Sequence, residues 1–268
     1  MSLTADILIA SARSRAPGPG PTYIETDTAR RLVEPWNAAS ALLFLALAAW
    51  WLWRLRGRYR RHAFLTACLP LVLVGGVGGT VYHAFRGHHV WLLMDWMPIA
   101  ALCIATAVYL LGKLLRRWWY ALPIVPAFFL VQTANFRLLA AHGQVQVAIA
   151  VSYSMLAGLI VVPTLGVLWK TRWANGRWTL LAAGCFVLAI AARQLDALAV
   201  DTGRTWMTQW LPMGSHFLWH VFGAGAGHCV AVFLYRLPDA WAHSRTGVPA
   251  ARRGPPPVGA GAERRRTP

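Results

Sequence analysis

Acidic residues are the scarcest charged class in this chain. Of its 268 residues only nine are Asp or Glu, against 26 Lys and Arg, so the formal charge at pH 7 is +17. Such an excess is typical of nucleic-acid-binding proteins when it forms a basic face on a soluble fold. Here the basic residues lie in short clusters between long apolar runs, which is how membrane proteins distribute positive charge. The pattern indicates a membrane protein with no nucleic-acid partner.

Cysteine pairs and strand-like alternation are also lacking. The chain has four cysteines, none in a C-x-x-C pair: Cys68, Cys103, Cys185 and Cys229. Neither a disulfide framework nor a thiolate zinc site is therefore indicated, and we expect these side chains to pack as small apolar groups. The absence of alternating apolar and polar residues argues against a β-barrel.

Apolar sequence is what the chain has in abundance, with 57% hydrophobic residues. A helix that spans a bilayer needs roughly 20 mainly apolar residues. Seven segments reach this length, at about 38–56, 62–84, 91–112, 118–135, 145–169, 178–199 and 213–236. We predict an all-α fold, a polytopic seven-transmembrane-helix bundle, over residues 23–236. Residues 1–22 are expected to be flexible, and 237–268, rich in Pro, Gly, Ala and Arg, to form a disordered basic cytoplasmic tail.

The basic clusters predict the orientation of this bundle. They lie at 54–61, 113–117 and 170–177, after the first, third and fifth predicted helices. Positively charged loops stay in the cytoplasm, which places the N-terminus outside and the C-terminus inside. The Ala- and Arg-rich composition favours a bacterial inner membrane, with the opposite end of the bundle facing the periplasm. The oligomeric state leaves no signal in the sequence.

Histidine and acidic side chains gather at the non-cytoplasmic end. His83 ends the second predicted helix, and Asp95 lies about one turn inside the third. His216 and His220 fall in the first two turns of the seventh helix, while the acidic segment at 23–37 precedes the first. Polar side chains in apolar helices are costly and tend to mark functional sites.

Histidines at positions i and i+4 share one face of a helix, so His216 and His220 can bind one metal ion together. His83 would complete a set of three imidazoles, and three protein ligands with an open position are typical of catalytic zinc. Asp95 could then hold the attacking water and transfer protons. An HxxxH pair alone more often forms a hydrogen-bonded core pair or a haem site. A bis-His haem protein and a transporter or receptor therefore stay open as further hypotheses.

The order of these motifs resembles that of the alkaline ceramidase family, within the CREST superfamily of seven-helix membrane hydrolases. The matching stretches are "EPWNAAS" at 34–40, "GGTVYHAFRGHHVWLLMDWMP" at 78–98 and "GSHFLWHV" at 214–221. An Asp near the end of the sixth helix is matched by Asp196, which we expect to pair with Arg193 one turn earlier. The resemblance covers roughly residues 23 to 236. It implies zinc-dependent hydrolysis of the amide bond in ceramide-like lipids, giving a sphingoid base and a fatty acid.

The resemblance also implies roles for individual residues. The zinc ligands would be His83, His216 and His220. Asp95 would orient or deprotonate the zinc-bound water. Some family members bind a structural calcium ion close to the zinc, and the acidic residues that match its ligands are Glu25, Asp27 and Glu34; hard oxygen donors of this kind suit calcium.

One position departs from the family pattern. The family has a Ser four residues before the histidine of the second helix, where its hydroxyl positions water or stabilises the oxyanion. This chain has Gly79 there, and the candidate catalytic replacement is Thr80, with Tyr82 and Ser215 as further candidates. Loss of an oxyanion donor typically costs about 10² to 10³ in rate. The departure therefore leaves room for another acyl lipid as the substrate.

Overall fold

The computed structural model of the protein describes residues 18–115, 117–203 and 206–246. Within these ranges every regular element is helical and no strand is formed. The long helices are α2 (Pro35–Arg54), α3 (Ala63–Phe85), α4 (His89–Leu115), α5 (Ile124–Ala141), α6 (Val145–Lys170), α7 (Gly176–Thr202) and α9 (His216–Thr246). Two short helices, η1 (Trp118–Ala121) and α8 (Trp206–Trp210), lie between them. Among the described residues, seven helices are long and apolar enough to cross a membrane, so the predicted all-α seven-helix bundle is confirmed.

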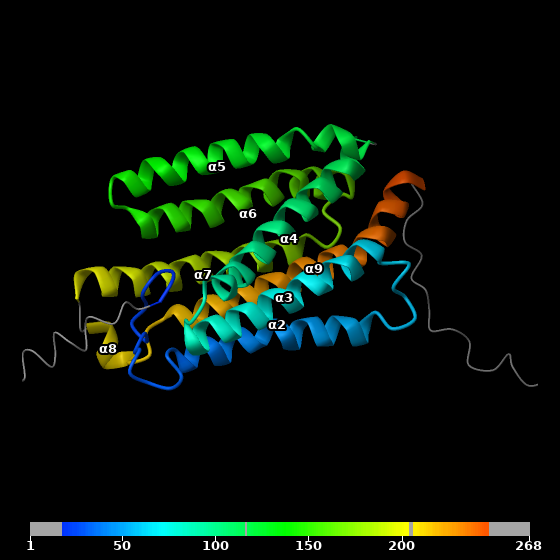
Figure 1. Cartoon of the computed structure of the whole chain (residues 1–268). Coiled ribbons are helices and arrows are strands. Elements are labelled where there is room, and N and C mark those ends of the chain that lie inside the picture. The colour runs from blue at the N-terminus through cyan, green and yellow to red at the C-terminus, as the bar shows by residue number, and fades with distance from the viewer. Residues whose placement is uncertain (1–17, 116, 204–205, 247–268) are drawn as a thin grey trace, which may run out of the picture.

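The long helices lie side by side in a bundle (Figure 1). Helix α3 packs against both α2 and α4, while α7 packs along α9. Helix α6 contacts α4 and α5, and α5 lies at the outer edge of the bundle (Figure 1). Large apolar side chains such as Leu130 on α5 and Val162 on α6 are exposed. An outer surface this apolar fits lipid better than water.

The two ends of the bundle have different interiors. The end that carries the basic loops is filled by two apolar clusters. One joins α4, α6 and α9 and contains Leu110, Val167, Leu168, Phe233, Leu234 and Leu237. The other joins α2, α3 and α9 and contains Trp51, Leu55, Leu65, Leu69 and Ala231. The opposite end buries histidines and carboxylates instead, so the fold separates an apolar half from a polar half.

The fourth candidate span, Trp119–Ala141, is interrupted near its start. The predicted segment is 118–135, whereas α5 starts at Ile124. Residues Trp118–Ala121 form a separate 3₁₀ turn, and Pro123 directly precedes α5. Proline has no backbone N–H and a fixed φ, so it suits the start of a helix and interrupts one that would run through it.

The two chain ends are more ordered than predicted where the structure describes them. The tail expected at 237–268 is helical as far as Thr246. Its Trp241 packs on the cluster between α4, α6 and α9 and lies near the ammonium groups of Lys113 and Lys170. The segment expected to be flexible at 1–22 is held from residue 18 onward by contacts with α3 that are described below. Residues 1–17 and 247–268 lie outside the described ranges.

Helices α3 and α4 approach each other closely at a glycine. A Cβ atom added to Gly78 would overlap both the backbone and the Cβ of Met94. Small residues at such positions let two membrane helices bring their backbones together. This contact sets the separation of α3 and α4, the helices that carry His83 and Asp95.

We expect Gly78→Ala to lower the free energy of unfolding by about 1–3 kcal/mol, the usual cost of overpacking. The backbone of Met94 cannot rotate away as a flexible side chain could. Gly158→Ala on α6 is the matched control, because no atom lies within 4 Å of the added Cβ there. Thermal unfolding of both proteins in one detergent makes the comparison. Equal stability of Gly78→Ala and wild type would contradict the close α3–α4 contact.

Candidate metal centre

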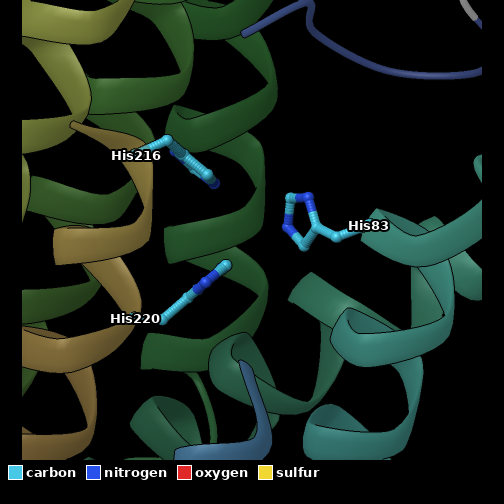
Figure 2. Close-up of side chains that lie close together, drawn as sticks. All are labelled: His83, His216 and His220. Atoms are coloured by element: carbon cyan, nitrogen blue, oxygen red, sulfur yellow. The ribbon is translucent and has the colours of Figure 1, made fainter. Parts of the chain in front are cut away.

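Three histidines converge at the polar end of the bundle. His83 comes from the last turn of α3, and His216 and His220 come from the first turns of α9 (Figure 2). Their ring centroids lie 4.9, 5.1 and 5.3 Å apart, and each ring offers a nitrogen within 4.8 Å of the other two. All three are at most 2% exposed. In the described part of the chain this histidine trio is the one group of His, Cys, Asp and Glu arranged to hold a metal ion.

The carboxylate of Glu34 orients His83. Its Oε2 atom is hydrogen-bonded to Nδ1 of His83, while Oε1 accepts hydrogen bonds from Thr26 at 2.6 Å and Arg86 at 2.7 Å. Burial alone would raise the pKa of Glu34, but the hydrogen bond to His83 and the charge of Arg86 hold it below its ordinary value. An ionised carboxylate only accepts, so Nδ1 of His83 carries the hydrogen. Nε2 keeps its lone pair and has no hydrogen-bond partner among the described residues.

Ser40 orients His220 in the same way. The Ser40 hydroxyl donates its only hydrogen to the carbonyl of Asn37 at 3.0 Å. Its oxygen therefore accepts from Nδ1 of His220, 2.8 Å away. Nε2 of His220 then keeps its lone pair, as Nε2 of His83 does. Metal-binding histidines usually donate their second ring nitrogen to a protein acceptor like this.

His216 is placed by its backbone and by an aromatic ring. Where α9 begins, Oδ1 of Asp196 accepts hydrogen bonds from the N–H of Ser215 at 2.8 Å and of His216 at 3.2 Å. Oδ2 accepts from the N–H of Ile24 at 3.1 Å. The ring of Tyr23 stacks on the imidazole of His216 with centroids 3.7 Å apart; burial raises the pKa of Tyr23 well above its ordinary value, so its phenol is neutral. Nδ1 of His216 has no hydrogen-bond partner within the described ranges.

These features fit a bound divalent cation. A buried nitrogen without a partner is unfavourable, because it has lost water and gained nothing in return. Nε2 of His83 and Nδ1 of His216 are two such atoms, both on rings of the trio, and ring nitrogens without a partner are the atoms that ligate a metal ion. Imidazole nitrogens suit zinc and also other first-row transition metals. The trio is therefore arranged so that it could hold a metal ion, and its chemistry does not fix which metal.

The acidic residues expected to bind calcium are used differently. Both oxygens of Glu25 accept backbone hydrogens at the start of α2, from Trp36 at 2.6 Å and Asn37 at 2.9 Å. Glu25 thus satisfies N–H groups that have no partner within the helix; burial raises its pKa, although these two bonds oppose the rise. Asp27 lies at the surface and pairs with Arg30 at 2.9 Å. These carboxylates do not converge on a shared point.

The third of these acids is Glu34, and the guanidinium group of Arg86 binds to its carboxylate and to two nearby carbonyl oxygens. Nη1 of Arg86 donates to its Oε1, and Nη2 of Arg86 donates to the carbonyls of Pro19 and Gly20, each at 3.3 Å. A carboxylate and two carbonyls are donors of the kind calcium prefers, but here a fixed positive charge takes them. Arg86 reaches them because it ends α3 in the left-handed conformation, with φ of 47°. The residues present therefore do not fit the calcium ion that the resemblance implies.

Asp95 lies on α4 opposite Gly79 of α3. A Cβ atom at Gly79 would come within 2.5 Å of Oδ1 of Asp95, so the missing side chain leaves the space that this carboxylate occupies. Asp95 interacts electrostatically with His83, and no hydrogen bond joins it to the trio within the described ranges.

The hydroxyls considered as replacements for the family serine all bond to backbone carbonyls. These pairs are Thr80 with Gly76 at 2.7 Å, Ser215 with Ala192 at 2.7 Å and Tyr82 with Pro19 at 2.9 Å. Each hydroxyl has a single hydrogen, so none of them donates towards the trio in this structure. The catalytic role of Thr80 stays a prediction.

The ion pair expected between Arg193 and Asp196 is not formed. Asp196 uses both oxygens for backbone N–H groups, while Nη2 of Arg193 donates to Oε1 of Gln146 on α6 at 3.2 Å. The i, i+3 spacing would allow the pair. The start of α9 instead presents N–H groups that lack a partner within their own helix, and these attract the carboxylate.

The sequence predicted no individual role for four residues of the site, although two of them lie in the quoted motif "EPWNAAS" at 34–40. They are Tyr23, Asn37, Ser40 and Arg86. A signal exists for two of them, because Glu34, Asn37 and Ser40 repeat every three residues and form a polar stripe on an apolar helix. Tyr23 and Arg86 leave no such signal, since their contacts depend on the path of the segment before α2 and on the left-handed end of α3.

Comparison with known proteins adds no family assignment. No protein-family model matches the sequence, and no curated protein matches it. The site is therefore interpreted from its own residues and from the motifs quoted above.

Glu34→Gln preserves the shape of the side chain but removes the charge that fixes the tautomer of His83. We expect zinc affinity to fall about 10- to 100-fold, as for other residues that orient metal-binding histidines. Competition with a chromogenic chelator measures the affinity on purified protein. Asp27→Asn is the control, an acid of the same segment that is exposed and paired with Arg30, and it should bind zinc normally. Unchanged affinity in Glu34→Gln would show that Glu34 does not orient the ligand.

Proposed function

We propose that the protein is a membrane-embedded, zinc-dependent amidohydrolase of the alkaline ceramidase type. It cleaves the amide bond of a ceramide-like lipid and releases a sphingoid base and a fatty acid. The observation that carries the proposal is the histidine trio, which is buried at one end of an apolar bundle with ring nitrogens left free. The order and spacing of the sequence motifs support the choice of reaction and substrate.

The three ligands would be His83, His216 and His220. Zinc held by these residues would supply Lewis-acid chemistry and would activate water as a nucleophile at neutral pH. Within the described residues no Cys, Asp or Glu joins the group as a fourth ligand. Three protein ligands are the pattern of catalytic zinc, whereas structural zinc is enclosed by four.

Asp95 is the proposed general base and acid. It takes a proton from the attacking water as the water oxygen bonds to the carbonyl carbon. It then gives the proton to the nitrogen as the carbon–nitrogen bond breaks, so that the amine can leave. Its position next to Gly79, and its interaction with His83, support this role.

The membrane supplies the substrate in this proposal. The site lies at the polar end of the bundle, opposite the two apolar clusters and the basic loops. With the basic loops in the cytoplasm, the N-terminus and the site face the other side, which is the periplasm in a bacterial inner membrane. The outer surface of the helices is apolar, which favours a substrate that is delivered from the bilayer.

Hydrolysis of another acyl lipid is the second candidate. Gly79 replaces the family serine, and the hydroxyls of Thr80 and Ser215 bond to backbone carbonyls. The stabilisation of the developing oxyanion therefore differs from the family pattern, and the preferred acyl bond can differ with it. A panel of N-acyl and O-acyl lipids separates the two candidates.

The geometry gives less support to a bis-His haem protein or to a transporter. The two axial histidines of a haem lie on opposite faces of a porphyrin, whereas these three rings meet within 5.3 Å of one another. A transporter needs polar groups along a path through the bilayer. Here the end opposite the trio is filled by two apolar clusters.

His220→Ala should abolish both zinc binding and lipid hydrolysis, because two imidazoles alone hold the ion weakly. Metal analysis of the purified protein and a fatty-acid release assay measure the two effects. His228→Ala is the control; this residue lies two turns further along α9, next to Trp51 and outside the trio. Normal zinc content and turnover in His220→Ala would rule out the mechanism.

Asp95→Asn should reduce turnover by about 10² to 10⁴, the range for loss of a general acid–base group. Zinc content should stay normal because Asp95 is not a ligand in this arrangement. Thr80→Val tests the sequence prediction in the same assay. Its hydroxyl bonds to the carbonyl of Gly76, so we expect turnover close to wild type. Hydrolysis of the lipid by Asp95→Asn at the wild-type rate would show that Asp95 is not the general base and acid.

A further inference from the structure

Arg193 on α7 is a buried cation without an anionic partner in the described part of the chain. It is 3% exposed, and Nη2 donates to the neutral amide of Gln146 at 3.2 Å. Nη1 has no hydrogen-bond partner, and no carboxylate lies within ion-pair distance of the guanidinium, among the residues that the structure describes. Arginine stays protonated in proteins, so it cannot lower the cost by losing its charge. A buried unpaired charge is strongly unfavourable and calls for an explanation.

The turn of α7 that carries Arg193 packs against the metal centre. The carbonyl of Ala192 accepts the hydroxyl of Ser215, and the carboxylate of Asp196 accepts the N–H of His216. Arg193 itself interacts electrostatically with His216. The guanidinium therefore lies beside the first turn of α9, which holds two of the three histidines.

Further polar groups surround the same place. Arg193 interacts electrostatically with Tyr23 from the N-terminal segment, Asp95 from α4 and Tyr153 from α6. Together with His216 on α9, groups from four parts of the chain thus interact electrostatically with this cation at the polar end of the bundle. Helices α6 and α7 pack against each other much less extensively than α7 and α9 do. On α6, the hydrogen-bond partner of Arg193 is a single side-chain amide.

The carboxylates of the described residues do not neutralise this charge. Asp196, one turn along the same helix, bonds to three backbone N–H groups. Glu34 bonds to Arg86 and His83. Asp95 acts on Arg193 but forms no ion pair with it. The described residues therefore supply no anion to Nη1 of Arg193.

We propose that Arg193 binds the anionic head of a single-chain lipid beside the histidine trio. A guanidinium suits oxyanions because its N–H groups form a planar fork that fits a carboxylate or a phosphate. The inference rests on the proposed function, in which a carboxylate arises at the acyl carbon when the amide is cleaved. A phosphate on the lipid head group has the same recognition chemistry, so the ligand class is a lipid oxyanion.

The test measures binding rather than turnover. Zinc-loaded full-length protein in a nonionic detergent is titrated with laurate, dodecyl phosphate or dodecanol, and the rise in unfolding temperature gives each affinity. Wild type should bind at least one of the two anions more tightly than the neutral alcohol. Laurate as the tighter ligand identifies a fatty-acid carboxylate, and dodecyl phosphate as the tighter one identifies a head-group phosphate.

Arg193→Gln should weaken anion binding about 10- to 100-fold, the usual value of a hydrogen bond to a charged group, and leave dodecanol binding and zinc content unchanged. Arg177→Gln removes the same charge from the exposed opposite end of α7 and should bind like wild type. Arg193→Lys keeps the charge without the planar fork, so it should lose affinity several-fold even if Arg193→Gln fails to fold. Wild-type anion affinity in either Arg193 variant, or no preference of wild type for anions over dodecanol, would overturn the inference.

Hydrolysis assays on the same samples separate this inference from the proposed function. If the protein hydrolyses the amide but its anion binding does not depend on Arg193, the proposed anion site is wrong and the proposed hydrolase activity is supported. If anion binding depends on Arg193 but no acyl lipid is hydrolysed, the anion site is supported and the proposed hydrolase activity is wrong.

Discussion

Glu34 is completely buried, so the protein itself must supply the hydrogen bonds that its carboxylate needs. The donors are Thr26, Asn37, His83 and Arg86. They come from the N-terminal segment, from α2 and from the end of α3, so one carboxylate holds three parts of the chain in register. Separating them would leave a buried charge unpaired, which costs several kcal/mol. The orientation of His83 is thus fixed by the fold before any ion binds.

The scarcity of acidic residues makes the use of each one more informative. Glu25 caps α2 from eleven residues upstream, and Asp196 caps α9 from the end of α7. A helix end that is buried in a membrane protein has little access to water, so its free N–H groups need protein acceptors. These two caps fix where α2 and α9 begin. Ser40 and His220, each about one turn inside its helix, meet because both starting points are fixed.

The parts of the structure that follow from local periodicity could be predicted, and those that follow from the path of loops could not. Hydropathy located the seven spans. The i, i+4 spacing of His216 and His220 predicted the trio, because the topology brings His83 to the same end of the bundle. The ordered segment before α2 and the left-handed conformation of Arg86 arise from tertiary contacts. The sequence therefore predicted neither the stacking of Tyr23 nor the position of Arg86 where a calcium ion was expected. The pairing of Arg193 with Asp196 was wrong because helix spacing does not show which neighbouring N–H groups compete for a carboxylate.

In the described part of the chain, Arg86 and Arg193 are both buried at the polar end, and the fold treats their charges differently. Arg86 and Arg193 are equally buried, each 3% exposed. Arg86 is neutralised by Glu34 and bonds to two carbonyls, and it ties the N-terminal segment to α3. Arg193 has only a neutral amide among its hydrogen-bond partners in the described chain, although Asp196 lies one turn away. Since the chain uses that carboxylate to cap α9, the charge of Arg193 is left for a ligand, and it stands next to the helix turn that presents His216.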